Sequence, residues 1–426
     1  MSDGSATAHL YRPKLLTTLS DGYRLTHLRK DVLAGLTVAI VALPLSMAIA
    51  VASGVPPERG LFAAIVGGLL VSALGGSRFQ VGGPAGAFIV LVAATVAKFG
   101  IEGLLLTVLL SGLMLTLIGL MRVGSLIRLV PHAVTVGFTG GIAIIIFASQ
   151  LKELAGLRLA GAEPGPLFPK LDALIHALPS LNPAALAVGC GVAVMIFLIK
   201  RWRPSWPGML IAVVLASALG ALLHLPVDTI GTRFGELPRN LPWPHLPHIS
   251  PALLWQVFPT ALSFTLLGAV ESLLSAKVAD GMTGRKHRSN MELVAQGIAN
   301  IGSALFGGIS VTGTIARTAT NVRAGAHSPF AGILHAVFLL LFLLVAAPLA
   351  RFIPLAALAG VLVVVCWNMA EKAEFVRLLS KRHEAAVLLA TFVLTLALDL
   401  TAGIVAGCLV AALLALAGKG VKSEGR

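Results

Sequence analysis

Two glycine-rich breaks in otherwise apolar stretches hold the residues of this chain that are best suited to bind a ligand. The first break, residues 78–88, reads Arg-Phe-Gln-Val-Gly-Gly-Pro-Ala-Gly-Ala-Phe, and the second, residues 306–319, reads Phe-Gly-Gly-Ile-Ser-Val-Thr-Gly-Thr-Ile-Ala-Arg-Thr-Ala. Each pattern predicts a short extended segment followed by a helix. Pro84 suits the first turn of one helix, and the hydroxyl of Thr312 or Ser310 is expected to cap the other.

The chemistry that such breaks favour is anion binding. The first N–H groups of a helix have no partner within the helix, and the terminus carries roughly half a positive charge. Gly82 and Gly83 permit close approach of the backbone to a ligand. Arg317, one helical turn beyond Gly313, adds a full positive charge. The alternative is that glycine and proline only bend helices here for packing, since both are common in membrane helices.

Glu271 is a second suggestive residue, because a carboxyl group in the middle of an apolar stretch is costly unless it is protonated, paired or bound to an ion. We expect it to bind a coupling cation, H⁺ or Na⁺, with Ser275 on the same helical face. The alternative is an ion pair with Arg317 that neutralises both groups. We expect His132 and His335, near the ends of their apolar stretches, to be structural.

The elements that position these residues are predicted to be membrane-spanning helices. Of the 426 residues, 57% are hydrophobic and only 12% are charged, and apolar runs such as 104–121 are long enough to cross a bilayer. These runs lack the alternation of a transmembrane barrel. The net charge of +14 is spread over short loops, which argues against a nucleic-acid-binding face. The three cysteines are widely spaced, so we expect neither a disulfide nor a metal site.

Fourteen apolar segments are predicted, and two of them, 84–99 and 313–323, are too short to cross as straight helices. They are the third and tenth segments, so they correspond in two halves of seven, and an odd number of crossings per half inverts the second half. The Pro-rich stretches 151–182 and 225–252 are predicted to be non-helical exterior loops. The fourteen segments are 32–51, 58–75, 84–99, 103–121, 132–150, 183–199, 207–224, 254–277, 291–306, 313–323, 329–347, 352–368, 384–399 and 401–417.

The cations predict an orientation for these segments. With fourteen crossings, 22 of the 32 Lys and Arg residues fall on the side of the N-terminus and eight on the other. Because cytoplasmic loops are rich in Lys and Arg, both termini are predicted to be cytoplasmic, in a multi-pass protein of a bacterial inner membrane. We divide the chain into a cytoplasmic segment (1–31), a transmembrane domain (32–418) and a C-terminal tail (419–426).

The ordered motifs resemble those of the SulP (sulfate permease) family of anion transporters. Besides the two breaks, the matching sequences are Asp-Val-Leu-Ala-Gly-Leu-Thr-Val from Asp31, Gly-Val-Pro-Pro-Glu-Arg-Gly-Leu from Gly54, and Asp-Leu-Thr-Ala-Gly-Ile from Asp399, within a resemblance that covers residues 30–418. The resemblance implies an all-α protein of seven plus seven inverted segments. It also implies a core domain and a gate domain, which would comprise about 32–121 with 254–347 and about 128–224 with 350–418.

The resemblance places the anion between the third and tenth segments. Together with Gly83 and Arg317 from the breaks themselves, the predicted substrate site comprises Gln80, Gly83, Ala85, Gly86, Ala87, Thr312, Gly313, Thr314 and Arg317. The predicted cation-coupling site comprises Glu271 and Ser275. Sodium-coupled bicarbonate members of the family have Asp where this chain has Glu271, so we favour protons.

The function implied is secondary active transport of sulfate, bicarbonate, chloride or a dicarboxylate such as fumarate, by proton-coupled alternating access. A passive anion channel and a sodium-coupled bicarbonate transporter are the alternatives. A related class that carries uracil or xanthine is disfavoured, because it would place acidic residues in the tenth segment as well. An enzyme is not expected, since the sequence has no HExxH pair and no clustered metal ligands.

We expect no cofactor beyond the co-transported H⁺, with Na⁺ as the alternative. The expected partners are a small inorganic or organic anion and the lipid bilayer, with a homodimer as a further option and no nucleic acid. Family members usually carry a STAS domain after the last segment. This chain ends at Arg426, so we expect the membrane domain without it.

Overall fold

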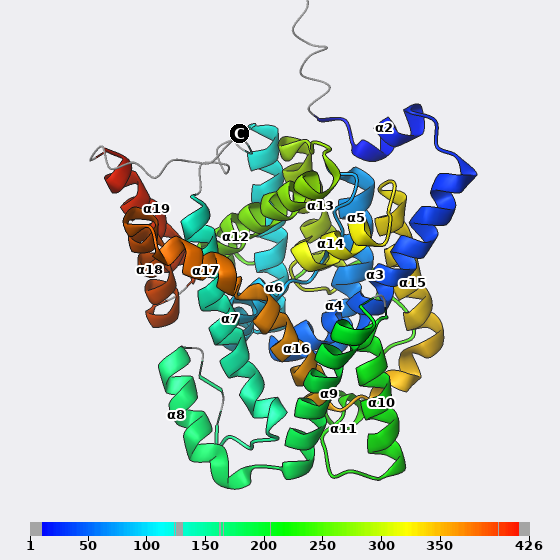
Figure 1. The fold of residues 1–426 in the computed structure, drawn as a ribbon, viewed down its shortest axis with the longest axis vertical. Helices are drawn as coiled ribbons and strands as arrows, with labels where there is room; N and C mark the ends of the chain where they lie inside the picture. Colours follow the sequence, from blue (N-terminus) through cyan, green and yellow to red (C-terminus); the bar gives the residue numbers. More distant parts are fainter. Residues whose placement is uncertain are drawn as a thin grey trace, which may run out of the picture. The chain divides into compact units, whose positions relative to one another are not determined.

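The computed structural model describes residues 11–122, 124, 131–161, 163–164, 166–204, 206–398 and 400–416, and this part of the chain is mostly helical (Figure 1). Within it, eight helical segments are long and apolar enough to cross a membrane, and two shorter apolar helices accompany them. The prediction that the apolar runs form helices is confirmed. The count of fourteen crossings in two inverted halves stays a prediction.

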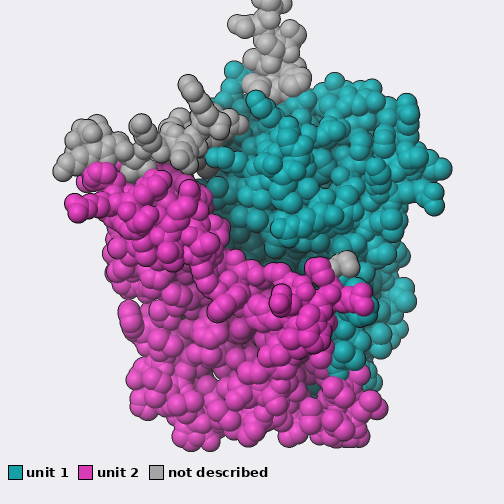
Figure 2. All heavy atoms as spheres, viewed as in Figure 1, with its two compact units in different colours: residues 1–127, 205–215, 229–353 teal, residues 128–204, 216–228, 354–426 magenta. Residues whose placement is uncertain are grey.

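The chain divides into two compact units (Figure 2). Unit 1 comprises residues 1–127, 205–215 and 229–353, and unit 2 comprises residues 128–204, 216–228 and 354–426. Every residue of the predicted substrate and coupling sites belongs to unit 1. The structure of that unit is therefore the part of the fold that bears on function.

Unit 1 contains most of the helices and the one strand pair assigned in the described residues. Its elements are α2 (Lys14–Ser20), α3 (Leu25–Ala52), α4 (Pro57–Phe62), the π-helical η2 (Ala63–Gly67), α5 (Gly68–Leu74), β1 (Gly82–Gly83), η3 (Gly86–Phe88), α6 (Ile89–Leu120), α11 (Ile230–Phe234), α12 (Pro251–Thr283), α13 (Ser289–Leu305), β2 (Thr312–Gly313), α14 (Ile315–Arg323), α15 (Phe330–Ala346) and η6 (Ala347–Phe352). Helix α10 (Gly208–Leu222) contributes its first half to this unit and its second half to unit 2.

Unit 2 is entirely helical in its described residues. Its remaining elements are α7 (His132–Leu154), α8 (Leu167–Ala177), η5 (Leu178–Ser180), α9 (Pro183–Trp202), α16 (Leu355–Met369), α17 (Lys372–Leu379), α18 (Arg382–Ala397) and α19 (Leu400–Leu416). Its core includes an apolar cluster in which Val134 and Val136 of α7 pack with Val387 and Leu388 of α18 and with Ala411 of α19. Asp399, one of the family motif positions, lies outside the described residues.

Several boundaries differ from the prediction. The stretches 151–182 and 225–252 are not wholly non-helical, because they contain α8 and α11. Pro169 lies in the first turn of α8, where proline is tolerated, and α11 ends at its C-cap Gly235. Asn182 caps the helix that follows the first stretch. The predicted segments 84–99 and 103–121 both fall largely within α6, and the predicted break between them coincides with a non-helical backbone at Gly100 (φ 69°, ψ −171°), where two helices meet at a kink. A glycine accepts this positive φ without strain.

The N-terminal segment is more structured than expected. Helix α2 lies within residues predicted only as a polar extension, and α3 begins at Leu25, ahead of the predicted position 32. Helix α3 is anchored further along by Asp31, whose buried carboxylate accepts hydrogen bonds from the backbone N–H groups of His327 (2.6 Å) and Ser328 (3.0 Å). It also accepts from the hydroxyls of Ser328 (2.5 Å) and Tyr23 (2.7 Å). Asp31 thereby ties α3 to the loop between α14 and α15.

Candidate functional site

The two glycine-rich breaks meet in unit 1 as a short antiparallel strand pair. Strands β1 and β2 pair with Gly82 opposite Gly313 and Gly83 opposite Thr312. The ladder is extended by a hydrogen bond from the backbone N–H of Thr314 to the carbonyl of Val81 (3.3 Å). Segments more than two hundred residues apart in the sequence thus form one structure, as expected for the matching breaks of two halves.

Each strand leads into a helix, although not at the residues predicted. The first helical turn, η3, begins at Gly86 after an extended Ala85, so Pro84 precedes the helix instead of occupying its first turn. Helix α14 begins at Ile315, and Thr314, at the N-cap position, makes no capping hydrogen bond through its side chain. The expected cap by Thr312 or Ser310 is wrong, because pairing of β2 with β1 keeps the chain extended through Gly313.

Arg317 is the third residue of α14 and is fully buried. Its guanidinium donates to the hydroxyl of Ser46 (3.0 Å) and to the carbonyl of Gly82 (3.4 Å), while its Nε has no partner among the described residues. A Cβ atom on Gly83 would lie 1.5 Å from Nη1 of Arg317. Glycine at position 83 is therefore required for the guanidinium to lie against β1.

No carboxylate in the described part of the chain pairs with Arg317. Glu271, the expected alternative partner, forms no ion pair with it there, and Arg317 binds only a hydroxyl and a carbonyl. Both of these groups are dipoles without a net charge. Arg317 therefore gives this site a positive character. Because an unpaired buried charge is strongly unfavourable, a bound anion would offset that cost.

Gln80 enters the site from the segment before β1, and a chain of hydrogen bonds orients its amide. The amide nitrogen of Gln296 in α13 donates to the carbonyl of Val311, which leaves the Gln296 oxygen to accept from the hydroxyl of Ser272 (3.2 Å). That hydroxyl in turn accepts from Nε2 of Gln80 (2.8 Å). Since an amide nitrogen has two hydrogens, the second N–H of Gln80 stays available to a ligand.

The remaining predicted anion contacts surround the same strand pair. Ala85 and Ala87 are buried, and Gly86 is half-buried between them. The hydroxyl of Thr312 donates to the carbonyl of Gly268 (3.4 Å). The hydroxyl of Thr314, in contrast, is buried and has no partner among the described residues, so it can donate to a bound ion.

The two predicted coupling residues lie in α12, but their surroundings differ. The side chain of Glu271 is half-buried, and its Oε2 atom is shielded from solvent without a partner in the described residues. Ser275, one turn later, is buried and donates to the hydroxyl of Thr318 (3.0 Å), which also accepts from the backbone N–H of Val81 (3.3 Å). Ser275 therefore joins α12 to both breaks, and its role beside Glu271 stays a prediction.

Sequence reasoning missed the polar side chains that hold the two breaks in place. Asn300 accepts from the backbone N–H of Val311 (2.9 Å) and donates to the carbonyl of the same residue (2.8 Å). A signal for them was present, since Glu292, Gln296 and Asn300 recur at every fourth position and therefore line one face of α13. The missed residues that contact the breaks are Ser46, Ser272, Gln296, Asn300, Thr318 and Asn321.

The two histidines singled out in the sequence, His132 and His335, belong to different units. His132 contacts Glu374 (2.8 Å) in unit 2. His335 is fully buried in α15 of unit 1. Neither makes a described hydrogen bond to a predicted anion contact.

Comparison with known proteins gives consistent matches along the chain. The model of the sulfate permease family matches residues 28–391. YvdB of Bacillus subtilis, named as a candidate sulfate transporter, is 42% identical over 393 residues, which are 92% of this chain and 74% of YvdB. The bicarbonate transporter BicA of a Picosynechococcus strain is 30% identical over 405 residues, which are 92% of this chain and 70% of BicA.

Solved structures agree with these matches. The transmembrane domain of a cyanobacterial bicarbonate transporter BicA superposes with a TM-score of 0.80 at 30% identity, covering 89% of this chain and 98% of that domain. SLC26A9 superposes with a TM-score of 0.87 at 21% identity, covering 97% of this chain and 69% of that chain. The second match concerns the fold alone.

Proposed function

Because the chain belongs to the sulfate permease family, we propose that it is a membrane transporter of a small oxyanion, sulfate or bicarbonate. The relatives compared above are named as transporters of these two ions, and none is named as an enzyme. The proposed binding site is the strand pair β1–β2 with the helix starts that follow it. Chloride and dicarboxylates such as fumarate are secondary candidates.

The observation that carries this proposal is the fully buried guanidinium of Arg317 against β1, which has no carboxylate partner among the described residues. A net positive charge in a site of low polarity favours a negative ligand over a neutral one. The second N–H of Gln80 and the hydroxyl of Thr314 add neutral donors. An oxyanion has several acceptor oxygens, so it suits this combination better than a nucleobase does.

We further propose that Glu271 couples anion uptake to a cation gradient. Its Oε2 atom is shielded from solvent and unpartnered in the described residues, and a carboxyl group in such a place binds a proton readily. Protonation would also remove a negative charge from the helix that borders the anion site. Proton symport is therefore favoured over sodium symport.

The mode of transport that we propose is alternating access of an inverted repeat, with the core and gate domains assigned from the sequence. Support comes from the two breaks, which meet as expected for matching elements of two halves. Cytoplasmic termini, an inner-membrane location and a homodimer belong to the same proposal. Topology reporters fused at either end and the mass of the purified detergent complex would test them.

The experiment that tests the function is an uptake panel with purified protein in liposomes. Radiolabelled sulfate, bicarbonate, fumarate and chloride are each offered with and without an inward proton gradient and with and without a sodium gradient. We expect uptake of sulfate or bicarbonate that exceeds its equilibrium level only when the proton gradient is present. Passive equilibration without a gradient requirement would instead indicate a channel, and no uptake of any of the four anions would contradict the proposal.

A further inference from the structure

A pocket of about 240 Å³ opens in unit 1 next to the first break. It is lined by Lys14, Arg78, Phe79, Asp280, Arg285 and Lys286. Four of these six residues are cations, and they come from α2, from the segment before β1 and from the loop after α12. All four lie in segments that the sequence places on the side of the N-terminus. The pocket is separate from the strand pair, although its wall residue Phe79 directly precedes Gln80.

The one carboxylate among the lining residues is already engaged. Asp280 accepts hydrogen bonds from the backbone N–H of His287 (3.1 Å) and contacts the ring Nδ1 of the same residue (2.6 Å). The turn that allows this contact is made by Gly284, whose φ is 69°. Asp280 is therefore directed at its own loop, and it offsets only part of the positive charge around the pocket.

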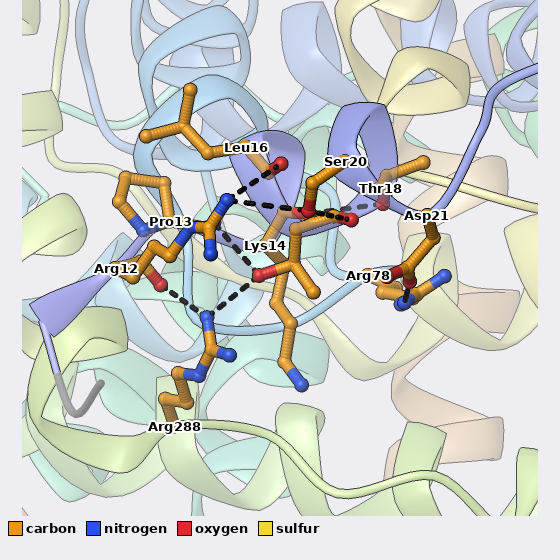
Figure 3. A network of polar contacts seen from close by, with 10 residues as sticks. Arg12, Pro13, Lys14, Leu16, Thr18, Ser20, Asp21, Arg78 and Arg288 are labelled. Atoms are coloured by element: carbon orange, nitrogen blue, oxygen red, sulfur yellow. Dashed lines mark hydrogen bonds and ion pairs between the residues drawn. The ribbon is translucent and has the colours of Figure 1, made fainter. Parts of the chain in front are cut away.

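The cations differ in how far they are paired. Arg78 contacts Asp21 (2.5 Å) through one guanidinium nitrogen (Figure 3). Among the described contacts, the N–H groups on its other two nitrogens are left to donate to a ligand. Lys14, Arg285 and Lys286 form no ion pair that involves a described residue. Burial lowers the pKa of Lys14, and the neighbouring positive charges of Arg288 and Arg78 lower it further. The pocket thus concentrates more positive charge than Asp21 and Asp280, the described carboxylates beside it, offset.

The walls of the pocket are held in place by backbone contacts. The backbone N–H of Lys14 donates to the carbonyl of Gly75 (2.9 Å), and that of Arg288 donates to the carbonyl of Gly76 (3.0 Å). The guanidinium of Arg288 donates to the carbonyl of Arg12 (2.5 Å) and to the hydroxyl of Thr17 (3.0 Å) (Figure 3). The cations are therefore presented by a fixed frame, which is what distinguishes a binding site from a diffuse basic surface.

We propose that this pocket binds a phosphate group carried by a larger molecule, and that the bound group fastens α2 to the loop between α12 and α13. Arginine donates in a planar fork that matches the oxygens of a phosphate, and lysine adds a mobile point charge. The volume exceeds that of a bare ion, so part of the carrier molecule fits as well. Because the wall continues into Gln80, binding here stabilises the segment that leads into β1.

The phosphate could belong to a soluble metabolite or to a lipid headgroup, and the test separates these two sources. ATP is titrated into the purified full chain in detergent, and phosphatidic acid is presented to it in nanodiscs, with phosphatidylcholine nanodiscs as the reference. Binding and the midpoint of thermal unfolding are measured for each. The proposal expects binding in at least one arm, together with a raised unfolding midpoint.

The deciding variant is the double substitution Arg285→Gln with Lys286→Gln. Both side chains are exposed, so folding should be retained. We expect the affinity to fall roughly ten-fold or more, as the loss of charge-assisted hydrogen bonds predicts. The matched control is Arg29→Gln with Lys30→Gln, which removes the same charge from exposed positions of α3 that do not line the pocket; its affinity should stay within about two-fold of the parent.

Absence of binding in both arms, or an equal loss in the two double variants, would overturn the proposal. Arg317→Ala should bind each probe as the parent does, because Arg317 does not line the pocket. The readout is binding and not uptake, so its result is independent of whether the transport proposal holds. Loss of ATP or phosphatidic acid binding in Arg317→Ala would assign the signal to the transport site and would also overturn the proposal.

Discussion

A Cβ atom on Gly313 would lie 1.5 Å from Nε2 of Gln80, so the side chain of Gln80 occupies the space that any larger residue at position 313 would need. Likewise, the guanidinium of Arg317 from the second break occupies the space that a side chain at Gly83 in the first break would need. Each break thus uses its own glycine to receive the functional side chain of the other break. Gln80 and Arg317 are brought to one place by this exchange, because neither could approach the opposite strand past a side chain.

The first prediction concerns Gly313→Ala. The added methyl group should displace the amide of Gln80 from Ser272, since the surrounding space is buried and Cγ of Gln80 would also lie within 2.8 Å of the new atom. We expect the apparent affinity for the transported anion to fall roughly ten-fold or more. The measurement is the concentration dependence of uptake in liposomes. Gly281→Ala in the exposed part of α12, where a Cβ meets nothing within 4 Å, is the control and should transport normally.

The second prediction concerns Arg317. Replacement by alanine should weaken anion binding by about 2–4 kcal/mol, the range for an uncompensated charged partner, without unfolding the protein. Lysine should restore part of the affinity, because it keeps the charge but loses the fork that reaches both Ser46 and Gly82. Uptake kinetics and the chromatographic profile of each variant provide the test. An unchanged apparent affinity in Arg317→Ala would rule out its role in the site.

The third prediction concerns Glu271→Gln. A neutral amide cannot exchange a proton, so gradient-driven accumulation should be lost while exchange of internal for external anion persists. Both are measured in the same liposomes with an imposed proton gradient. Glu236→Gln serves as the control, because Glu236 is exposed and, within the described part of the chain, pairs only with Arg351 (3.1 Å). If accumulation survives in Glu271→Gln, the coupling site lies elsewhere.

The fourth prediction concerns Asp31→Asn. The carboxylate accepts four hydrogen bonds, and an amide that replaces it can accept at only one of its two positions. We expect a loss of about 2–4 kcal/mol in stability, seen as a lower midpoint of thermal unfolding in detergent. The apparent anion affinity of the folded fraction should be unchanged, since Asp31 makes none of the described contacts with the strand pair. A variant as stable as the parent would show that this junction contributes little.

The fifth prediction concerns alkaline pH. Burial has the largest effect, and the hydrogen bond to Asp31 the next largest, in raising the pKa of Tyr23 above its ordinary value of 10.0. For an acid whose pKa is raised on folding, the stabilisation is complete below the unfolded value and is lost as pH rises above it. Unfolding midpoints should therefore fall above about pH 10 more steeply in the parent than in Tyr23→Phe. Parallel curves for the two proteins would contradict the assignment.

The helical class, the two breaks and the positive charge of the site could be predicted, because each depends on residues that are close together in the sequence. Apolar runs show as composition, the breaks show as glycine clusters, and Arg317 is a cation within a short apolar segment. The strand pairing was not predictable, since it depends on which backbone groups of β1 and β2 face each other across more than two hundred residues. The same holds for the relay from Gln296 through Ser272 to Gln80, whose members lie on three separate elements.

Strand pairing overrides the local capping preference at the start of α14, and this explains the wrong prediction there. Thr312 and Ser310 are good capping residues in isolation, but the ladder between Gly313 and Gly82 keeps their segment extended past both. Helices α8 and α11 are not predicted from the sequence, because the high proline content of their stretches argues against helix. Proline is tolerated before a helix and in its first turn, which is where Pro166 and Pro169 lie relative to α8.

The pairing of β1 with β2 also sets the order in which the protein can mature. Arg317 lies 235 residues after the carbonyl of Gly82 that it contacts, so a ribosome that has delivered the first break must continue into the second half, as far as α14, before the site can close. During that interval Gln80 and the glycines of β1 have no partner strand, and contacts so distant in sequence form slowly. Insertion of α12 to α14 is therefore the step at which a binding site first exists, and defects in that region should leave the early helices inserted but without a site.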